Sequence, residues 1–253
     1  MRSGEGKLKH APPMKTRLDR LIVERGLTES REKAQALIMA GEVRLNGQKA
    51  TKPGHTVEDD CTLEVLSRPP YVSRGGFKLA GALRHFALDV AGKVCLDIGS
   101  STGGFTDVLL QAGALRVHAV DCGSGQLDWK LRTDPRVVVH DGLNARSLTF
   151  QDIGEPVDFL CCDVSFISVT LILPAATPLL RPGGQMVILI KPQFEVGKGQ
   201  VGKGGIVREP ALHRAACEKV ERAVREIGFE TAIVESPIAG AEGNKEFLLY
   251  ARH

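Results

Sequence analysis

Residues 93–113 constrain the fold of this chain more than any other stretch, because a strand pattern, a glycine turn and a helix pattern follow one another there. The apolar run from Val94 to Ile98 is typical of a strand that is buried on both faces. Three glycines then allow a tight turn and the close approach of a ligand to the backbone: Gly99, Gly103 and Gly104. After them, apolar residues recur at helical spacing. This order predicts the first half of a nucleotide-binding βαβ unit.

Two acidic residues indicate the ligand of this unit. Asp121 ends the next predicted strand, about 20 residues on, where a carboxylate can accept the hydroxyls of a ribose. Asp97 precedes the glycine turn, and an acid there would repel a pyrophosphate but suits a sulfonium or an amine. The spacing of the glycines also departs from the Gly-x-Gly-x-x-Gly of dinucleotide sites. We therefore expect S-adenosylmethionine rather than NAD, with Ser100 and Phe105 among its contacts; a purely structural turn is the alternative.

Three further predicted strands, at 137–140, 157–162 and 186–190, also end in polar residues. These residues are Asp141 with Gly142, Asp163 and Lys191, respectively. Strands that alternate with helices form a parallel sheet, and the carboxyl ends of its strands hold the ligand crevice. We therefore expect these side chains to line one active site together with Asp97 and Asp121. Asp141 is expected to receive the adenine amine of the ligand, and Gly142 to lie beside it.

The last part of the chain predicts a mobile segment and the edge of the sheet. Residues 195–208 are too rich in glycine for a helix, and we expect a basic loop there, either a lid over substrate with Lys198 and Lys203 or a plain surface loop. An amphipathic helix follows at 212–227. Two strands, at 231–234 and 247–250, are expected to form an antiparallel edge hairpin. The second part of the chain is therefore predicted to be an α/β fold.

The composition excludes several classes of protein. With 253 residues, of which 43% are hydrophobic and 25% charged, the chain resembles an ordinary soluble globular protein. No signal peptide is apparent, and the most apolar window, 159–173, is too short to span a bilayer. The six cysteines show no Cys-x-x-Cys spacing, which argues against a zinc site and against a disulfide framework. We therefore expect a cytoplasmic protein without a metal and without a membrane partner.

The N-terminal part holds the basic excess. Residues 1–78 contain 15 Lys and Arg against 10 Asp and Glu, which indicates a polyanionic partner. After a flexible tail at 1–14, one helix can end at Gly26, and a second can begin after Ser30 and end at Gly41. Asn46-Gly47 is a strong hairpin signal, and a further strand is expected at 62–66. These elements predict a compact α+β module.

This module resembles an S4 RNA-binding domain. The resemblance is carried by Arg17-Leu18-Asp19, by Ser30-Arg31-x-x-Ala34-x-x-Leu37-Ile38-x-x-Gly41-x-Val43 and by Asn46-Gly47. It implies that residues 15–66 bind RNA, mainly through its phosphates and shape. The candidate RNA-binding residues in this module are Arg17, Arg20, Arg31, Lys33, Gln35 and Arg44. Residues 67–76, with the stiff Pro69-Pro70 and the flexible Gly75-Gly76, are expected to be a linker.

The whole chain resembles the TlyA family, in which an S4 domain precedes a methyltransferase of the FtsJ type. The resemblance rests on Ser73-Arg74-Gly75-Gly76-Phe77-Lys78-Leu79, Leu96-Asp97-Ile98-Gly99-Ser100-Ser101-Thr102-Gly103-Gly104, Asp163-Val164-Ser165-Phe166-Ile167-Ser168, Lys191-Pro192-Gln193-Phe194-Glu195 and Gly243-Asn244-x-Glu246-Phe247. It implies a Rossmann-like class I methyltransferase domain at 77–253. It also implies 2′-O-methylation of cytidine in ribosomal RNA, in 16S, 23S or both, by S-adenosylmethionine, with ribosomal subunits as partners.

The family's catalytic tetrad carries over to Lys78, Asp163, Lys191 and Glu246. A ribose hydroxyl is a poor nucleophile, so transfer needs in-line positioning and the removal of one proton. A lysine can take that proton when desolvation or a second lysine favours its neutral form. We expect Lys191 to be the base, flanked by Lys78, with Asp163 orienting the Lys191 ammonium and Glu246 holding Lys78 or the ribose.

Phe166, in the third motif, is expected to contact RNA. Two other functions stay open. The family is also labelled haemolysin A, which suggests a membrane-active protein, although the sequence contains neither a spanning helix nor a strongly amphipathic basic helix. The other is a ribosome-assembly factor that binds RNA and S-adenosylmethionine with little turnover.

Overall fold

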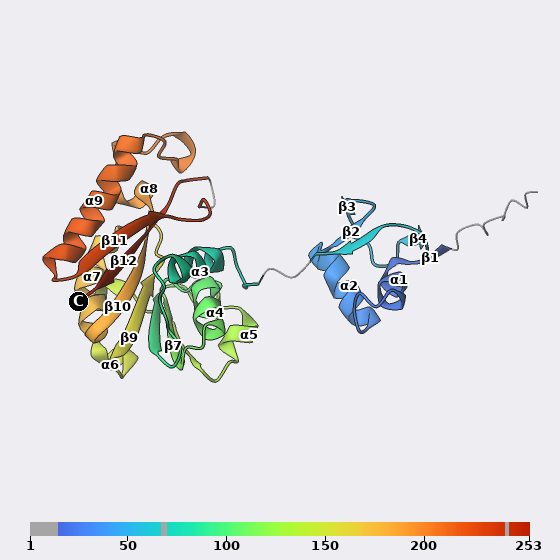
Figure 1. The fold of residues 1–253 in the computed structure, drawn as a ribbon, viewed down its shortest axis with the longest axis horizontal. Coiled ribbons are helices and arrows are strands. Elements are labelled where there is room, and N and C mark those ends of the chain that lie inside the picture. The colour runs from blue at the N-terminus through green and yellow to red at the C-terminus, as the bar shows by residue number, and fades with distance from the viewer. Residues whose placement is uncertain (1–14, 67–69, 241–242) are drawn as a thin grey trace, which may run out of the picture. The chain divides into compact units, whose positions relative to one another are not determined.

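The computed structural model describes residues 15–66, 70–240 and 243–253. The chain divides into two compact units, residues 1–70 and residues 71–253, and each is described here by itself (Figure 1). The predicted tail at 1–14 and residues 67–69 of the predicted linker lie outside the described residues.

The first unit packs two helices against two small antiparallel sheets. Its elements are β1 (Lys15–Arg17), α1 (Leu18–Glu24), α2 (Arg31–Ala40), β2 (Val43–Leu45), β3 (Gln48–Lys49), β4 (Thr56–Glu58) and β5 (Leu63–Val65). β1 pairs with β4, and β2 pairs with both β3 and β5. The pairing confirms the predicted small α+β module, whereas β1 and β4 are additions to the elements that the sequence predicted.

Local sequence explains the turns of the first unit. The Ser30 side chain caps α2 by accepting a hydrogen bond of 3.2 Å from the Lys33 amide. Gly41 ends the same helix in the left-handed conformation, at φ 74°. Asn46 and Gly47 both have positive φ, 50° and 78°, which is the geometry of a tight hairpin between β2 and β3. Each of these three turns is therefore as predicted.

Seven strands of the described chain form one sheet in the second unit. They are β6 (Val94–Ile98), β7 (Arg116–Asp121), β8 (Val137–Asp141), β9 (Val157–Cys162), β10 (Leu180–Ile190), β11 (Glu230–Glu235) and β12 (Phe247–Arg252). Their order is β11-β12-β10-β9-β6-β7-β8. The strands from β10 to β8 are parallel, and β12 is antiparallel to both β10 and β11. This order confirms the predicted Rossmann-like sheet with an antiparallel edge hairpin.

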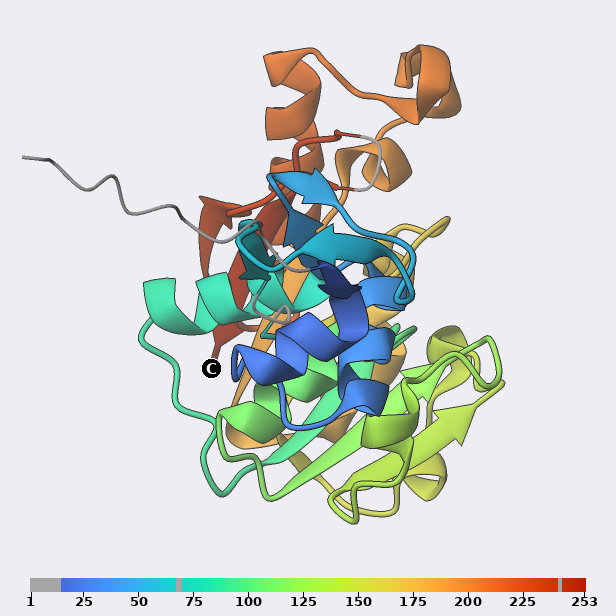
Figure 2. The ribbon, with the colours of Figure 1, turned by 90° about the vertical axis from the view of Figure 1, so that its right-hand side faces the viewer.

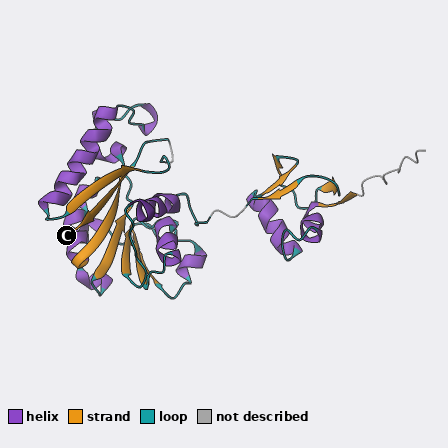
Figure 3. Cartoon of the chain, in the orientation of Figure 1, coloured by secondary structure: helices purple, strands orange, loops and turns teal. Residues whose placement is uncertain are grey.

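Helices cover both faces of this sheet (Figures 1 and 3). One face carries α3 (Gly75–His85), α4 (Gly104–Gln111) and α5 (Trp129–Arg132). The other carries α6 (Phe150–Ile153), α7 (Leu173–Ala176) and α9 (Pro210–Glu226). The short α8 (Pro192–Glu195) follows β10, and the orange segment after it stands beyond the carboxyl ends of the parallel strands (Figure 2). Within 195–208 the described backbone forms only the end of α8 and two short 3₁₀ turns, at 198–200 and 203–205.

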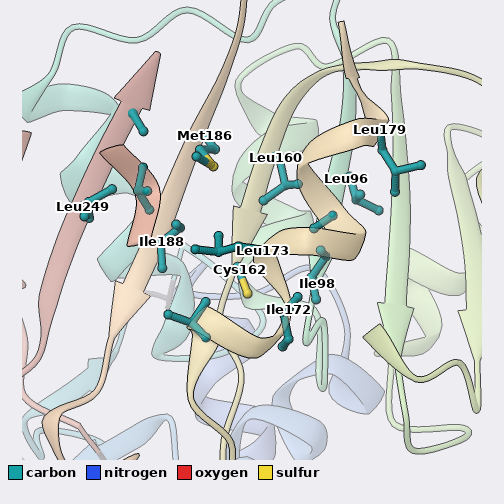
Figure 4. Close-up of a cluster of buried hydrophobic side chains, with 14 of the residues drawn as sticks. Leu96, Ile98, Leu160, Cys162, Ile172, Leu173, Leu179, Met186, Ile188 and Leu249 are labelled. Carbon is teal, nitrogen blue, oxygen red and sulfur yellow. The ribbon is translucent and has the colours of Figure 1, made fainter. Parts of the chain in front are cut away.

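The inner strands of the sheet, such as β6 and β9, are buried on both faces, so their residues alternate between two cores. In β6, Leu96 and Ile98 face one core and Cys95 faces the other. Figure 4 shows the first core, where Ile172 and Leu173 lie over the strand residues. This explains the uninterrupted apolar runs in the sequence, which are typical of strands inside a parallel sheet.

The beginning of the second unit differs from the predicted linker. Gly75 and Gly76 form the first turn of α3 rather than a flexible hinge. A Cβ atom on Gly76 would overlap the ring of Tyr71, so the glycine allows a close contact here. The Val72 amide donates to the Asp107 carboxylate at 2.9 Å. Residues 71–76 therefore belong to the second unit, and Lys78 is held one turn inside a packed helix.

Among the described residues, no helix is both long enough and apolar enough to cross a membrane.

Candidate active site

Three cavities adjoin one another at the carboxyl ends of the parallel strands. The wide cavity, of about 580 Å³, shares Gly99, Ser101 and Asp163 with the glycine-turn cavity, of about 250 Å³. A lysine cavity, of about 350 Å³, shares Lys78 with the glycine-turn cavity. Ser165 and Phe166 line both the wide and the lysine cavities. A ligand in the first two cavities therefore lies next to a ligand in the third.

The wide cavity suits the adenosine half of S-adenosylmethionine. Its walls are largely apolar, and its polar groups include the side chains of Asp121 and Asn144. The Asp121 carboxylate is fixed by the amides of Ser101 and Gly123, at 2.8 and 2.7 Å. Carboxylate oxygens have further lone pairs, so Asp121 can still accept the hydroxyls of a ribose. The residues present therefore fit the cofactor that the glycine turn predicts.

Close backbone packing forms the floor shared with the glycine-turn cavity. Gly99 has φ 83°, and a Cβ atom there would overlap the carbonyl oxygen of Asp163. The predicted residues Ser100, Gly104 and Phe105 line this cavity, together with Ser73 and Arg74. Hydroxyl and guanidinium groups thus surround the space next to the turn, which suits the amino-acid part of the same cofactor.

Four predicted cofactor residues do not line these cavities. Gly103 has φ 98° at the start of α4 and packs on Leu131, so its role is in the backbone turn. Asp141 pairs with Arg132 at 2.6 Å, which lowers the pKa of its carboxyl and holds it away from the wide cavity. Gly142 follows it with its amide bound to the Gly123 carbonyl at 3.0 Å. The direct contacts predicted for Gly103, Asp141 and Gly142 are therefore not supported by their positions.

Asp97, the fourth, is completely buried beneath the glycine turn. It accepts hydrogen bonds from the Thr106 hydroxyl at 2.6 Å and from the Cys161 thiol at 3.7 Å. Burial, opposed by the Thr106 hydrogen bond and aided by the nearby Asp163 charge, raises its pKa to about 7. Asp97 therefore supports the turn from below, and its burial does not support the predicted direct contact with the ligand.

This burial predicts a pH-dependent effect of Asp97→Asn. A carboxyl whose pKa rises from about 4 in the unfolded chain to about 7 in the folded protein favours folding only while it is protonated. The contribution of this carboxyl to the unfolding free energy of the wild type is therefore lost as pH rises from 4 through 7. Asparagine does not titrate, so the variant does not show this decrease. We expect the unfolding free energy of the variant, relative to wild type, to increase by about 2 kcal/mol between pH 5 and 7 and then to level off. Urea denaturation at several pH values measures this, and a pH-independent difference would contradict it.

The four tetrad residues form two ion pairs at the lysine cavity. Lys78 Nζ lies 2.6 Å from Glu246 Oε2, and both side chains are at least nine-tenths buried. Lys191 Nζ lies 2.6 Å from Asp163 Oδ1 and donates to Ser165 Oγ at 2.9 Å. Both lysines line the lysine cavity, whereas Asp163 faces the other two cavities. The structure thus brings all four predicted residues together, each cation with its own carboxylate.

Phe166 stands at the entrance of this site. Its side chain is 92% exposed, and its φ of 67° is unusual for a bulky residue. The ring centroid lies 5.3 Å from that of Phe194, which also lines the lysine cavity. An exposed aromatic ring held in a strained backbone conformation is a candidate contact for a nucleobase.

In the first unit, one buried acid gathers three of the predicted RNA-binding residues. Asp19 is completely buried and accepts hydrogen bonds from Arg17, Arg31 and Gln35 at 2.9–3.1 Å. The Arg17 guanidinium, followed by its other partners, holds the pKa of the Asp19 carboxyl far below its usual range. Arg17 and Arg31 remain about half exposed. The arginines are thus fixed in place with part of each guanidinium facing solvent.

The other predicted RNA-binding residues are less constrained. Arg20 pairs with Glu24 on the exposed surface of α1, at 2.6 Å, and Lys33 of α2 pairs with the exposed Glu29, which precedes that helix. Arg44 is exposed in β2, and Lys203 is exposed in the second 3₁₀ turn of the glycine-rich segment. The side chain of Lys198 lies outside the described residues.

Sequence reasoning missed several residues that line the site. Ser165, Gln193 and Asn244 each lie inside a motif that was quoted for the family resemblance, but no role was assigned to them. Asn144 follows the predicted Asp141-Gly142 by two residues and lies in the wide cavity in place of Asp141. Asn144, Ser165 and Gln193 each lie shortly after a strand, which identifies the loop but not the direction of a side chain, whereas Asn244 lies just before β12.

Asp121→Ala tests the assignment of the wide cavity. If the Asp121 carboxylate accepts the ribose hydroxyls, its loss should weaken S-adenosylmethionine binding by about 1–3 kcal/mol, or about 5- to 150-fold. Asp141→Ala is the matched control: it removes an acid at the next strand end that does not line the cavity, and affinity should stay within about twofold of wild type. Calorimetric titration measures both. Equal effects of the two variants would contradict the assignment.

Comparisons with known proteins agree with this architecture. The family model described as FtsJ-like methyltransferase matches residues 71–253, and the S4 domain model matches residues 16–60. The 16S/23S rRNA (cytidine-2′-O)-methyltransferase TlyA of Mycobacterium tuberculosis is 49% identical over 94% of this chain and 90% of its own length. Hemolysin A of Brachyspira hyodysenteriae is 44% identical over 92% of this chain and 98% of its own length. A solved structure from Streptococcus thermophilus is 46% identical, covers 96% of this chain and 89% of its own, and has a TM-score of 0.72.

Proposed function

This chain belongs to the FtsJ-like methyltransferase family, and from that premise we propose its substrate and the roles of its residues. It transfers a methyl group from S-adenosylmethionine to the ribose 2′-hydroxyl of cytidine in 16S or 23S ribosomal RNA. Residues 15–66 form the RNA-binding module, and residues 71–253 form the catalytic module. Because ribosomal subunits are the proposed substrate, the proposed compartment is the cytoplasm.

One observation carries the proposal for the catalytic residues. Lys78 and Lys191, each paired with a carboxylate, line a cavity that adjoins the cofactor cavities through Lys78, Ser165 and Phe166. A nucleoside in the lysine cavity would therefore present its ribose between the two lysine nitrogens and the methyl donor. Such positioning converts transfer into an effectively unimolecular step.

S-adenosylmethionine supplies an electrophilic methyl group when it is bound. Lys191, in its neutral form, accepts the proton of the 2′-hydroxyl as the oxygen is methylated. Asp163 and Ser165 hold the Lys191 nitrogen in place, at 2.6 and 2.9 Å. Glu246 holds Lys78, whose buried ammonium faces the ribose and favours the developing negative charge on its oxygen.

RNA reaches the site through contacts of two kinds. Arg17 and Arg31, preorganised by Asp19, offer charged donors to phosphates without reading sequence. Arg20, Lys33 and Arg44 add basic charge to the same module. In the second unit Phe166 offers an exposed ring to a base, and Lys203 lies in the basic segment beside the lysine cavity.

Methyl transfer from radiolabelled S-adenosylmethionine tests this function. We expect label in the RNA of ribosomal subunits, with repeated turnovers, and none in DNA oligonucleotides of the same sequence, which lack the 2′-hydroxyl. A single turnover or less would favour the assembly-factor alternative. Label in DNA would contradict the ribose assignment.

A further inference from the structure

Glu195 is a buried carboxylate that the proposed reaction does not use. It ends α8 and is 7% exposed. Its Oε1 accepts the Val169 amide at 2.8 Å, and its Oε2 accepts the Ser168 hydroxyl at 2.5 Å. Lys219, from α9, donates to the same Oε2 at 3.0 Å and to the Glu195 carbonyl at 2.9 Å. One carboxylate thus joins α8, α9 and the loop that follows β9.

These contacts are the second of two attachments between α8 and the loop that follows β9. Lys191 precedes the single turn of α8 and binds Asp163 and Ser165. Glu195 ends that turn and binds Ser168, at the other end of the same loop. The loop 163–168 is therefore held at both ends by α8, with the strained and exposed Phe166 between the two attachments.

These contacts mainly fix the position of the loop and contribute little to the stability of the fold. Lys219 is 45% exposed, so solvent screens much of its attraction to Glu195, and the ion pair adds little to stability. A buried carboxylate also loses solvation, which offsets much of its attraction to the partner. The three hydrogen bonds that the Glu195 carboxylate accepts fix the distance from loop 163–168 to Lys191. A misplacement of about 1 Å between reacting groups can lower a rate on the order of 10²-fold.

We propose that Glu195, anchored by Lys219, is a positioning residue for methyl transfer. By fixing Ser168 and Val169 it sets the loop that presents Asp163, and so sets where the Lys191 nitrogen stands relative to the methyl donor. This inference rests on the proposed function, because it assigns Glu195 a role in that reaction without contact with either substrate.

Glu195→Gln tests the inference against a matched control. It keeps the size of the side chain but loses the charge, and kcat for ribosomal RNA should fall on the order of 10²-fold. KM for RNA and the affinity for S-adenosylmethionine should change by about twofold or less, because Glu195 lines none of the three cavities. Exchange of the Val169 amide should speed up, because its acceptor is weakened. Glu155→Gln is the control: Glu155 accepts hydrogen bonds from Arg116 and His118 and lies just before β9, at the amino ends of the parallel strands, and the variant should keep the wild-type kcat.

Lys219→Met is a second test of the same contact. Because Lys219 is half exposed, we expect this variant to fold even if Glu195→Gln does not. We expect kcat about tenfold lower, and a double variant no slower than Glu195→Gln, since both changes act through one contact. The inference is contradicted if Glu195→Gln keeps the wild-type kcat, or if Glu155→Gln loses as much. A wild-type protein that methylates no RNA would contradict the proposed function instead. In that case unchanged exchange at Val169 in Glu195→Gln would still contradict the positioning contact.

Discussion

Lys191→Ala is expected to lower kcat by about 10²–10⁴-fold, the usual contribution of a positioned general base. The variant keeps both cofactor cavities, because Lys191 lines only the lysine cavity. RNA and S-adenosylmethionine affinities should therefore change little, since the lost interaction is made in the transition state. Single-turnover methylation, together with calorimetry of the cofactor, measures the two effects separately.

Lys191→Arg distinguishes a base from a fixed charge. Guanidinium keeps the positive charge beside Asp163 but does not release its proton near neutral pH. We expect it to restore less than about a tenth of the activity lost in Lys191→Ala. Full activity of the arginine variant would mean that position 191 supplies only charge and that water takes the proton.

Removal of residues 1–66 is expected to lower the affinity for ribosomal RNA by at least about 10²-fold. The deleted part contains the arginines that Asp19 gathers, and phosphate contacts of this kind supply most of the affinity for RNA backbones. The second unit keeps its own two cores, so S-adenosylmethionine affinity should stay within about twofold. Filter binding with ribosomal subunits, alongside calorimetry of the cofactor, measures this.

A pair of substitutions in the full-length chain shows whether a loss of RNA binding comes from these arginines rather than from truncation itself. Arg31→Ala in the full-length chain should weaken RNA binding more than Arg20→Ala, because Arg31 is held by the buried Asp19, whereas Arg20 lies in an exposed pair with Glu24. Undiminished RNA binding by the truncated protein would show that the first unit is not the RNA anchor.

The sequence predicted the position of the site because the carboxyl ends of parallel strands meet at one edge. Asp121, Asp163 and Lys191 each follow an apolar run, and the structure places all three on the walls of adjoining cavities. What a strand pattern does not decide is the direction of each side chain. Asp97 lies one residue before the end of β6 and points into the interior, and Asp141 turns to Arg132, which is nine residues earlier.

Other features depend on contacts between segments far apart in the chain. Lys78 and Glu246 form an ion pair although most of the sequence of the second unit lies between them. Only the family resemblance suggested that they act together. Glu195 was predicted as the start of a glycine-rich loop, yet it is buried, because Lys219 and the loop after β9 supply its partners. Local sequence contains no signal for such contacts, since they form only when α8 and α9 pack together.

Nucleoside mass spectrometry of ribosomal RNA tests the central claim most directly. RNA from cells that lack this chain is compared with RNA from the same cells that express it, either as wild type or as Lys191→Ala. The account predicts 2′-O-methylcytidine in the wild-type sample only. Methyl groups on a base rather than on ribose, or equal amounts of 2′-O-methylcytidine in all three samples, would contradict it.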